Sequence, residues 1–584
     1  MTDIFLVAIN SRYNHTNLAV RSIVQYAKQQ NPTITDELLA FHEFSIANFA
    51  QDILHGIMKQ NPKIVIFSVY IWNTRLVFDV IRELRKIRPD VAIGAGGPDV
   101  SYRAKELFEN FPELDFISQG EGEITNLEVT EIAQELIKNN EFSREAFLPK
   151  IRSVKGIYTK QIDNSRYYGG GRPFIEDLSI LPFAYPVLDE VDTKLFYYES
   201  SRGCPFLCTY CLSSIEKGVR FMPLERVYED LTRFFDARVK IIKFVDRTFN
   251  LNTKRYLSMW KWIVANHNGH TMCHFEIAAE FLDDEALDFL QTVPAGVMQF
   301  EIGIQTTNPQ TLKAIKRPAN LQKLTQKIAR IPKTIHSHLD LIAGLPHESI
   351  VEFAESFNYV LNLRPDMLQL GFLKVLAGTQ MEQFARENNY KWLTFPPHEV
   401  LETPTLSYDE IYFLHNLETV LEWYYNSGNF AKSIEFLLQH SDSPYKLFES
   451  ITTYFTSTNV FDLQYKIQAH FSLLDDYVKS NCSQIYETAT ELIRFDYFKM
   501  QKTSVFPECF ELHYDKDKHH AALMAHTDMR STREAYTNSS FETFAINPLT
   551  LEPTPTDILF LYGKRAMKKV ETQVILVNNL PVLS

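Results

Sequence analysis

Cysteine is scarce in this sequence. Only six of the 584 residues are cysteine, and none of them precedes Cys204. Cys273, Cys482 and Cys509 lie far from one another along the chain. Structural zinc sites normally draw on closely spaced cysteine pairs, so these three residues predict no zinc site of their own.

Long apolar runs are also missing. The N-terminal run Ile4–Ile9 is too short for a secretory signal and follows no basic leader. No other run reaches the roughly 18 apolar residues that span a membrane. We therefore expect a cytoplasmic protein with no membrane partner, in which thiols stay reduced.

Positive charge is not in excess. The chain has 59 Lys and Arg against 72 Asp and Glu, a formal net charge of -13. Phosphate neutralisation dominates nucleic-acid binding, so a protein whose whole surface follows nucleic acid is disfavoured, although a local basic groove stays possible. No internal repeat or low-complexity segment is present. The length indicates about three domains.

The cysteines that are present are grouped. Cys204, Cys208 and Cys211 form a C-x3-C-x2-C motif directly after a strand-like run. Thiolates this close usually share a metal, because a cation offsets their negative charges. A disulfide satisfies only two of them, and structural zinc normally needs four protein ligands. A [4Fe-4S] cluster with one open iron fits better, with zinc or a purely structural cluster as alternatives.

This spacing, with the aromatic residue Tyr210 just before Cys211, resembles the signature of the radical S-adenosylmethionine (SAM) superfamily. The resemblance implies that SAM binds the open iron through its amino and carboxylate groups. One electron then cleaves SAM to methionine and a 5′-deoxyadenosyl radical, a chemistry that the cofactors carry. A reducing partner such as a flavodoxin or a ferredoxin is implied as well.

Residues 1–140 alternate short apolar runs with amphipathic stretches of helical length, which predicts a doubly wound parallel sheet. Ligands bind such sheets in the loops at the carboxyl ends of the strands. The expected strands are Ile4–Ile9, Glu37–Phe41, Ile64–Tyr70, Val91–Gly94 and Asp115–Ser118, and expected helices include Asn17–Gln29 and Thr74–Arg88.

Unusual residues follow four of these strands. Glycines there allow a ligand to approach the backbone, although each group alone can equally be a tight turn. The residues are Asn14, His15, Ser68, Gly96, Gly97, Pro98, Gly120, Glu121 and Gly122. The set resembles the cobalamin-binding domain that precedes the radical SAM core in anaerobic magnesium-protoporphyrin ester cyclase-like enzymes and class B radical SAM methyltransferases. The resemblance implies that a cobalamin lies across this edge.

One motif of better-known cobalamin proteins is absent. Their Asp-x-His-x-x-Gly motif supplies a histidine to cobalt. Here His15 lies in the matching loop, but Tyr13 stands at the position of the Asp and Leu18 at that of the Gly. We expect cobalamin without a protein histidine ligand, with His15 as a cobalt ligand the less favoured alternative.

Residues 141–192 are expected to be a linker. Lys155–Tyr158 and Arg166–Tyr168 flank Asp163-Asn164-Ser165, which is typical of a hairpin. Glycine and proline residues then interrupt the chain, and spacing is the expected role.

Residues 193–392 alternate again with barrel-like spacing, and active residues of such barrels follow the strands. The six expected strands are Phe196–Ser200, Ile241–Asp246, His274–Ala278, Val297–Ile304, Ser337–Ile342 and Met367–Leu373. They resemble the partial (β/α)6 barrel of radical SAM enzymes. The resemblance implies SAM contacts by Glu280, Gly303, Gln305, Arg317 and Gly344. An ion pair or helix cap is the alternative for Glu280 and Arg317. Arg247 replaces the second acidic residue of an Asp-Asp-x-Phe-like motif, and no catalytic side chain is assigned.

Residues 393–584 have helical patterns rich in Phe and Tyr, followed by two strand patterns at Asp557–Tyr562 and Val570–Val577. They resemble the uncharacterised C-terminal domain of one branch of this group. The expected fold is thus α/β, with a Rossmann-like cobalamin-binding domain, a partial (β/α)6 TIM-like radical SAM barrel and a mainly α C-terminal domain.

The expected function is SAM cleavage at a [4Fe-4S] cluster and cobalamin-dependent methylation of an unactivated carbon. Cobalamin-assisted cyclisation or rearrangement is the main alternative. RNA methylthiotransferases have similar barrel motifs but need cysteines near the N-terminus, which this chain lacks. A non-catalytic corrinoid or redox sensor is the non-enzyme alternative.

Overall fold

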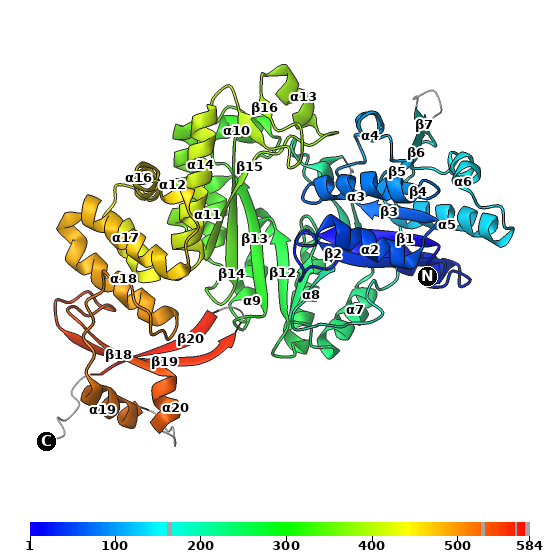
Figure 1. The fold of residues 1–584 in the computed structure, drawn as a ribbon. Coiled ribbons are helices and arrows are strands. Elements are labelled where there is room, and N and C mark those ends of the chain that lie inside the picture. The colour runs from blue at the N-terminus through cyan, green and yellow to red at the C-terminus, as the bar shows by residue number, and fades with distance from the viewer. Residues whose placement is uncertain (161–165, 216–217, 527–531, 567–568, 578–584) are drawn as a thin grey trace. The chain divides into compact units, whose positions relative to one another are not determined.

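The computed structural model describes residues 1–160, 166–215, 218–526, 532–566 and 569–577 (Figure 1). The chain forms two compact units. The first comprises Met1–Glu352 and Gly371–Tyr408, and the second comprises Phe353–Leu370 and Asp409–Ser584.

A seven-stranded sheet with the order β2-β1-β3-β4-β5-β6-β7 opens the first unit. The first five strands are parallel, as expected of a doubly wound domain. Their bounds are β1 Ile4–Asn10, β2 Leu39–Ser45, β3 Ile64–Ser68, β4 Ala92–Gly96 and β5 Phe116–Ser118. The strand order changes direction between β1 and β3, so the loops after these two strands flank the ligand-binding crevice of such a fold.

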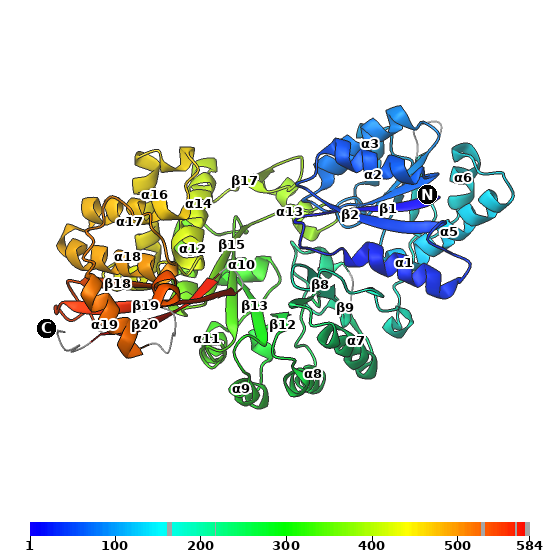
Figure 2. The ribbon, with the colours of Figure 1, turned by 60° about the horizontal axis from the view of Figure 1, so that its bottom comes forward.

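Alternating residues of β1 pack against opposite faces of this sheet. Phe5 and Val7 belong to one core with helices α2 (Ala50–Gln60), α3 (Thr74–Ile87) and α4 (Ala104–Asn110). Leu6 and Ala8 belong to a second core with α1 (Leu18–Gln30), α5 (Gly122–Lys138) and α6 (Arg144–Ile151). Figure 2 shows α1 and α5 on one side of the sheet and α2 and α3 on the other. The predicted helix-sheet-helix arrangement is confirmed.

The predicted linker adds two strands to the sheet. β6 (Ile157–Lys160) pairs antiparallel with β5, and β7 (Arg166–Tyr168) pairs antiparallel with β6. The predicted hairpin pairing is confirmed, whereas its turn at Asp163–Ser165 lies outside the described residues. The segment therefore extends the sheet as well as spacing the domains.

A six-stranded sheet follows. Its neighbouring strands pair in parallel from β8 through β11, β12 and β13 to β14. The strands are β8 Leu195–Tyr198, β11 Ile241–Phe244, β12 Met272–Ile277, β13 Met298–Gln305, β14 His336–Ala343 and β15 Met367–Phe372. All six predicted barrel strands are present. The intervening helices are α7 Leu224–Asp236, α8 Thr253–Asn266, α9 Asp284–Leu290, α10 Pro309–Ala314, α11 Leu321–Ala329 and α12 Ile350–Asn362.

The loop after β1 extends this second sheet at its β8 edge. His15 forms an isolated parallel bridge with Leu195. The Leu195 N–H donates to the Asn14 carbonyl at 2.7 Å, and the Thr16 N–H donates to the Leu195 carbonyl at 3.3 Å. The edge of the first sheet that carries the predicted ligand loops is therefore joined directly to the barrel.

The first unit ends in helix α13 (Gln380–Glu387) and the short antiparallel pair β16 (Lys391–Trp392) and β17 (Val400–Glu402). The second unit contains helices α14 Tyr408–Leu421, α15 Ala431–Gln439, α16 Pro444–Ser457, α17 Ile467–Asn481, α18 Tyr486–Met500, α19 Lys516–His526 and α20 Thr532–Thr537. A three-stranded antiparallel sheet completes it, with β18 Ser539–Phe544, β19 Thr556–Ala566 and β20 Lys569–Leu576.

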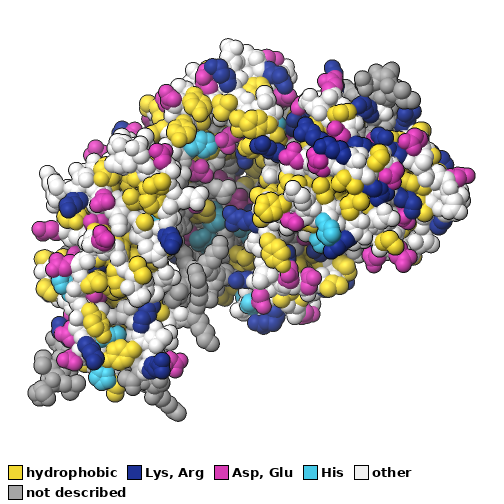
Figure 3. Space-filling model, in the orientation of Figure 1, with side chains coloured by type: hydrophobic (Ala, Val, Ile, Leu, Met, Phe, Trp, Pro, Cys, Tyr) yellow, Lys and Arg dark blue, Asp and Glu magenta, His cyan; other side chains and the backbone are white. Residues whose placement is uncertain are grey.

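The described residues include no helix long and apolar enough to cross a membrane. On the face shown in Figure 3, acidic and basic side chains are interspersed.

Candidate active site

The cysteine loop begins at the end of a short antiparallel hairpin, β9 (Ser201–Cys204) with β10 (Gly218–Phe221). Cys204 pairs with Gly218. Gly203 has φ +95°, and a Cβ on it would lie 2.2 Å from the Gly218 carbonyl oxygen. Glycine is therefore required just before the first cysteine, because a side chain would break the hairpin.

Buried polar groups hold the strand that leads into the loop, and a backbone hydrogen bond holds the loop itself. The Asp246 carboxylate accepts hydrogen bonds from the hydroxyls of Ser200 and Ser201, each at 2.6 Å, and burial raises its pKa. Within the loop, the Thr209 N–H donates to the Ile315 carbonyl at 3.1 Å. The predicted Asp246 motif thus anchors the strand that leads into the cysteines.

The three cysteines are free thiols. Cys208 is buried, and Cys204 lies 3.6 Å from the Thr248 hydroxyl, with its pKa raised by burial. Among the described residues, no three His, Cys, Asp or Glu side chains are close enough to hold a single metal ion. Three thiols on one loop suit an iron-sulfur cluster, which cysteine thiolates hold at separate irons, better than a structural zinc ion that needs four protein ligands.

Arg317 connects this loop to β13. Its guanidinium donates to the Cys208 sulfur at 3.7 Å and to the Gly303 carbonyl at 2.8 Å. Burial opposes its charge, yet Tyr210 and Cys208 together keep its pKa above the usual value. Gln305 follows on the same strand with φ +71°. Arg317 thus joins Gly303 of β13 to Cys208 and Tyr210 of the loop, and their contacts with SAM stay a prediction.

The other two predicted SAM residues are placed differently. The backbone carbonyl of Glu280 accepts a hydrogen bond from Lys327 at 2.6 Å, and the charge of its carboxylate acts on Arg317. Gly344 follows β14, and a Cβ there would lie 2.6 Å from Val400. A side chain at position 344 would collide with Val400, so this close packing requires a glycine.

Two inward-facing carboxyl groups were missed by the sequence reasoning. Glu276 of β12 and Asp340 of β14 both have pKa values raised by burial. One oxygen of Asp340 is buried with no hydrogen-bond partner among the described residues, which is the mark of a polar ligand position. Asp340 pairs in register with Gly303. The sequence signal that could have identified Asp340 was a charged residue within an expected barrel strand, on the same side of the sheet as Gly303 and Gln305.

The same inward faces carry an ion-pair network nearer the amino ends of the strands. Glu301 accepts from Lys243 at 3.0 Å and lies 2.9 Å from the His274 ring nitrogen. Burial opposes the charge of Glu301, but His274 and Lys243 lower its pKa to about 2. This satisfied network closes the floor of the barrel beneath the Arg317 group.

The carboxyl edge of the first sheet brings together most of the predicted cobalamin loops. Ser68 ends β3 and pairs with Gly96, which ends β4. Gly97 has φ +118°, and a Cβ on it would lie 2.3 Å from the Val69 carbonyl oxygen. Pro98 is exposed beside it. Gly97 is therefore required for close packing on the Val69 carbonyl, and the side chains beside it, those of Ser68 and Pro98, are small, which fits the close approach of a flat macrocycle.

Tyr70, in the loop after β3, lies at the junction with the barrel. Burial raises its pKa, and the charges of Arg247 and Glu199 act on it. Its ring stacks on Trp72 with centroids 4.3 Å apart. Arg247 is exposed, and no hydrogen bond or ion pair of its side chain occurs among the described residues. An aromatic platform and a guanidinium thus face the same space.

His15 lies at the same junction, where hydroxyl groups contact its ring. Its Nδ1 lies 3.0 Å from the Tyr197 hydroxyl on β8 and 3.2 Å from the Ser11 hydroxyl. The ring is half-buried, and burial lowers its pKa. The neighbouring Asn14 is exposed and contributes its backbone carbonyl to Leu195.

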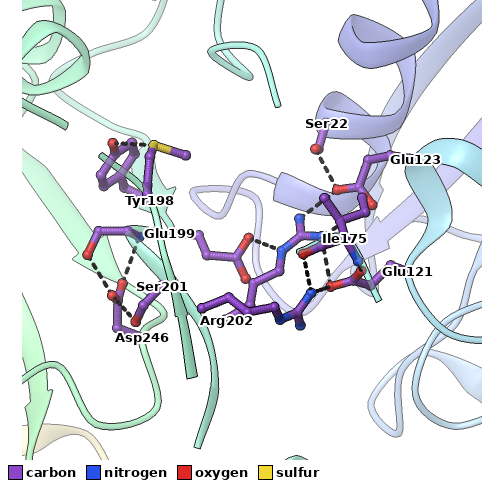
Figure 4. A network of polar contacts seen from close by, with 12 residues as sticks. Ser22, Glu121, Glu123, Ile175, Tyr198, Glu199, Ser201, Arg202 and Asp246 are labelled. Atoms are coloured by element: carbon purple, nitrogen blue, oxygen red, sulfur yellow. Dashed lines mark hydrogen bonds and ion pairs between the residues drawn. The ribbon is translucent and has the colours of Figure 1, made fainter. Parts of the chain in front are cut away.

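The loop after β5 does something that the sequence did not indicate. Gly120 is exposed, and Gly122 starts α5, where a Cβ would lie 2.7 Å from Ile23. Glu121, between them, forms ion pairs with Arg220 at 2.8 Å and with Arg202 at 3.2 Å. Figure 4 shows this network between α5 and the hairpin that leads to Cys204.

Family models match three successive segments. Residues 4–130 match the B12 binding domain, residues 198–360 the radical SAM superfamily, and residues 386–576 a protein family of unknown function, DUF4080. The first two ranges contain the glycine edge and the cysteine loop respectively. They imply cobalamin at the former and a [4Fe-4S] cluster with SAM at the latter, and the thiols, the unpartnered Asp340 oxygen and the edge of glycines and small side chains fit these groups.

Relatives share this architecture. The chain is 23% identical over 459 residues to the cobalamin-dependent radical SAM methyltransferase TokK of Streptomyces tokunonensis, covering 74% of this chain and 65% of TokK. It is 26% identical over 250 residues to the anaerobic magnesium-protoporphyrin IX monomethyl ester cyclase of Synechocystis sp., covering 40% of this chain and 46% of the cyclase. The match thus spans less than two thirds of the length of either relative.

A solved structure shows the same fold. The cobalamin-dependent S-adenosylmethionine radical enzyme OxsB, with aqua-cobalamin and S-adenosylmethionine bound, superposes with a TM-score of 0.56 at 14% identity. The superposition covers 84% of this chain and 78% of OxsB. The chain thus combines segments that match the B12 binding domain, the radical SAM superfamily and DUF4080, and in this it is similar to cobalamin-dependent radical SAM enzymes.

Proposed function

We propose that this protein is a cobalamin-dependent radical SAM methyltransferase that methylates an unactivated carbon of its substrate. The observation that carries the proposal is the junction of the two predicted cofactor edges within one compact unit. The loop after β1 pairs with Leu195 of β8, and His15 contacts Tyr197. A corrinoid on the glycine edge would therefore face the barrel mouth, where a substrate carbon can be held between the two cofactors.

The residues have separate roles in this proposal. Cys204, Cys208 and Cys211 would hold the cluster, which when bound supplies the electron for SAM cleavage. Arg317, with its guanidinium fixed by the Gly303 carbonyl, presents a positive charge for the SAM carboxylate. Asp340, whose pKa is raised by burial, would contact a SAM hydroxyl through its buried oxygen, which has no hydrogen-bond partner among the described residues.

Ser68, Gly96, Gly97 and Pro98 would support the corrin ring, with Tyr70 beside it. Arg247 is left for the substrate. Its side chain is exposed and makes no hydrogen bond or ion pair with another described residue, while its charge acts on Glu276 and Tyr70. It can orient an anionic substrate group, since a guanidinium binds a carboxylate or phosphate through two hydrogen bonds.

The test is anaerobic incubation of the cluster- and cobalamin-loaded protein with an extract, a reductant such as flavodoxin, and SAM carrying a trideuterated methyl group. Mass spectrometry should detect a product that carries the label only with the wild-type protein, and not with the Cys204→Ala, Cys208→Ala and Cys211→Ala triple variant. SAM cleavage with an unlabelled product would instead support cyclisation or rearrangement. Cobalamin binding without SAM cleavage would support a sensor.

A further inference from the structure

The ion network that joins α5 of the B12-binding domain to the hairpin of the cysteine loop suggests a role beyond holding the two domains together. Arg202 donates to Glu123 at 2.6 Å and to Glu199 at 2.7 Å. Arg220, its partner across the hairpin, donates to Glu121 at 2.8 Å. The network therefore binds both strands of the hairpin to the first residues of one helix (Figure 4).

These charges are withdrawn from water. The side chains of Arg202 and Arg220 are each 13% exposed, that of Glu121 is 10% exposed and that of Glu123 is 5% exposed. Arg202 holds the pKa of Glu123 below its usual value although burial opposes this. Ser22 of α1 donates a further hydrogen bond to Glu123 at 2.8 Å. Exposed ion pairs hold their partners weakly, but a buried and hydrogen-bonded set fixes them in one geometry.

The linker (residues 141–192) belongs to the same network. The Ile175 N–H donates to Glu121 at 2.6 Å, and the Ile175 carbonyl accepts from Arg220 at 2.6 Å. Glu121 thus joins the B12-binding domain to the linker at Ile175 and to the hairpin. The glutamates of the GEGE segment serve this junction, while the glycine Gly120 before them remains exposed at the corrinoid edge.

Position in the chain makes the network a route between the two cofactor sites. Arg202 lies two residues before Cys204, and the one residue between them, Gly203, is paired in the hairpin and packs closely on the Gly218 carbonyl. On the other side, Glu121 directly follows Gly120 in the loop after β5. Anything that orders this loop therefore orders Arg202 and, through it, the first cluster cysteine.

We propose that Arg202 and Arg220 are positioning residues that couple cobalamin binding to the geometry of the cluster loop, with Glu121 and Glu123 as their counterparts on α5. The inference rests on the proposed binding of cobalamin to the glycine edge. Filling that edge restrains the β5–α5 loop, and the network transmits the restraint to the β9–β10 hairpin. SAM bound to the open iron is thereby oriented only when cobalamin is in place.

The experiment measures amide hydrogen exchange of the β9–β10 hairpin in cluster-loaded protein, with and without cobalamin. The wild type should show exchange slowed about tenfold by cobalamin, within the usual range of coupling between sites. Arg202→Gln with Arg220→Gln removes the two positive charges of the hairpin and leaves the residues of the cobalamin edge unchanged. This double variant should still bind cobalamin, as followed by its absorption spectrum, but should lose the slowing in the hairpin.

Glu128→Gln is the matched control. Glu128 lies on α5 and forms an ion pair with Arg172, away from the hairpin, so the variant should behave as the wild type. Electron paramagnetic resonance of the reduced cluster gives a second readout, because its signal should change on cobalamin addition in the wild type and the control only. If the double variant does not fold, Arg220→Lys, which keeps the charge but replaces the planar guanidinium, should show a partial loss of slowing.

Equal slowing in the wild type and the double variant, or no slowing in the wild type despite bound cobalamin, would overturn the proposed coupling. Failure of the wild type to bind cobalamin would refute the proposed function itself and remove the basis of the inference.

Discussion

At the scale of single residues, the site divides into positions that the sequence exposes and positions that only the fold brings together. Three cysteines in eight residues are visible in any one-dimensional reading, because no other part of the chain has such a group. Asp340 and Arg202 are not, since an isolated Asp or Arg has many ordinary roles. Their significance comes from an unpartnered buried oxygen in one case and from contacts to a distant helix in the other.

Gly97 illustrates how the structure changes an experiment. Enlarging this glycine is not a clean test of corrinoid binding. Its φ of +118° disfavours any side chain, and an added Cβ would lie 2.3 Å from the Val69 carbonyl oxygen. We expect Gly97→Ala to destabilise the N-terminal sheet by about 1–3 kcal/mol, within the range for strained backbone.

Gly120→Ala is the matched comparison, because Gly120 also has a positive φ but its added Cβ would meet nothing within 4 Å. Urea unfolding followed by hydrogen exchange of β4 peptides measures the difference. Equal destabilisation by the two substitutions would show that the Val69 contact is not the cause.

His15 carries a second prediction at this scale. Its Nδ1 faces two hydroxyl groups, those of Tyr197 and Ser11, and no carboxylate in the described part of the chain is hydrogen-bonded to the ring. Metal-bound histidines normally have their second nitrogen fixed by a carboxylate or a carbonyl, which also makes them better ligands. We therefore expect cob(II)alamin in this protein to lack a histidine nitrogen ligand.

Electron paramagnetic resonance provides the measurement, because an axial nitrogen splits each cobalt line into three. Lines without this splitting, in the wild type and in His15→Ala alike, are expected. Triplets that vanish in His15→Ala would make His15 a cobalt ligand and contradict the prediction.

At the scale of helices and strands, apolar periodicity was sufficient wherever an element is buried on a regular face. All five strands of the N-terminal parallel sheet and all six barrel strands were predicted, with ends displaced by a few residues. The β9–β10 hairpin was not predicted. Its strands are four residues long, and their inward side carries Arg202 and Arg220, so they show no apolar alternation.

Helix α15 in the second unit depends on a contact outside its own sequence. Its first residue follows Phe430, which supplies no side-chain cap. The Asp496 carboxylate of α18 instead accepts from the Ser433 N–H at 2.8 Å and from the Ser433 hydroxyl at 2.7 Å. Asp496 is buried, and burial raises its pKa to about 6.

This raised pKa predicts a pH dependence of stability. The folded state binds the proton more tightly than the unfolded state, whose aspartate has an ordinary pKa near 3.8. Stability is therefore highest below about pH 4 and falls by about 3 kcal/mol as pH rises to about 6, from this group alone.

Asp496→Asn should abolish this dependence while keeping one hydrogen-bond acceptor for α15. Exchange rates of α15 peptides between pH 4 and pH 7, corrected for intrinsic rates, measure it. Asp442→Asn, at an exposed position before α16, is the control and should retain the wild-type dependence. The same dependence in Asp496→Asn would assign the effect to another group.

At the scale of the whole molecule, the sequence predicted the order of the parts because each has its own pattern of alternation. It did not predict how the first two are joined. The His15 bridge to Leu195 and the contacts of Arg202 and Arg220 with Glu123 and Glu121 join residues more than 75 positions apart, which no local pattern encodes. The boundary between the two compact units also falls within the predicted barrel, because most of α12 and of β15 groups with the C-terminal helices. The spacing of the predicted strands did not indicate this boundary.

The central claim is that one chain unites a SAM-cleaving cluster with a corrinoid. The most direct measurement is the yield of 5′-deoxyadenosine and methionine from SAM after anaerobic reconstitution, with iron and cobalamin contents determined on the same sample. We predict close to four irons and one cobalamin per chain, consistent with one [4Fe-4S] cluster. SAM cleavage should require a reductant and be lost when Cys204, Cys208 and Cys211 are replaced by Ala. Cleavage that survives this triple substitution, or zinc in place of iron, would contradict the account.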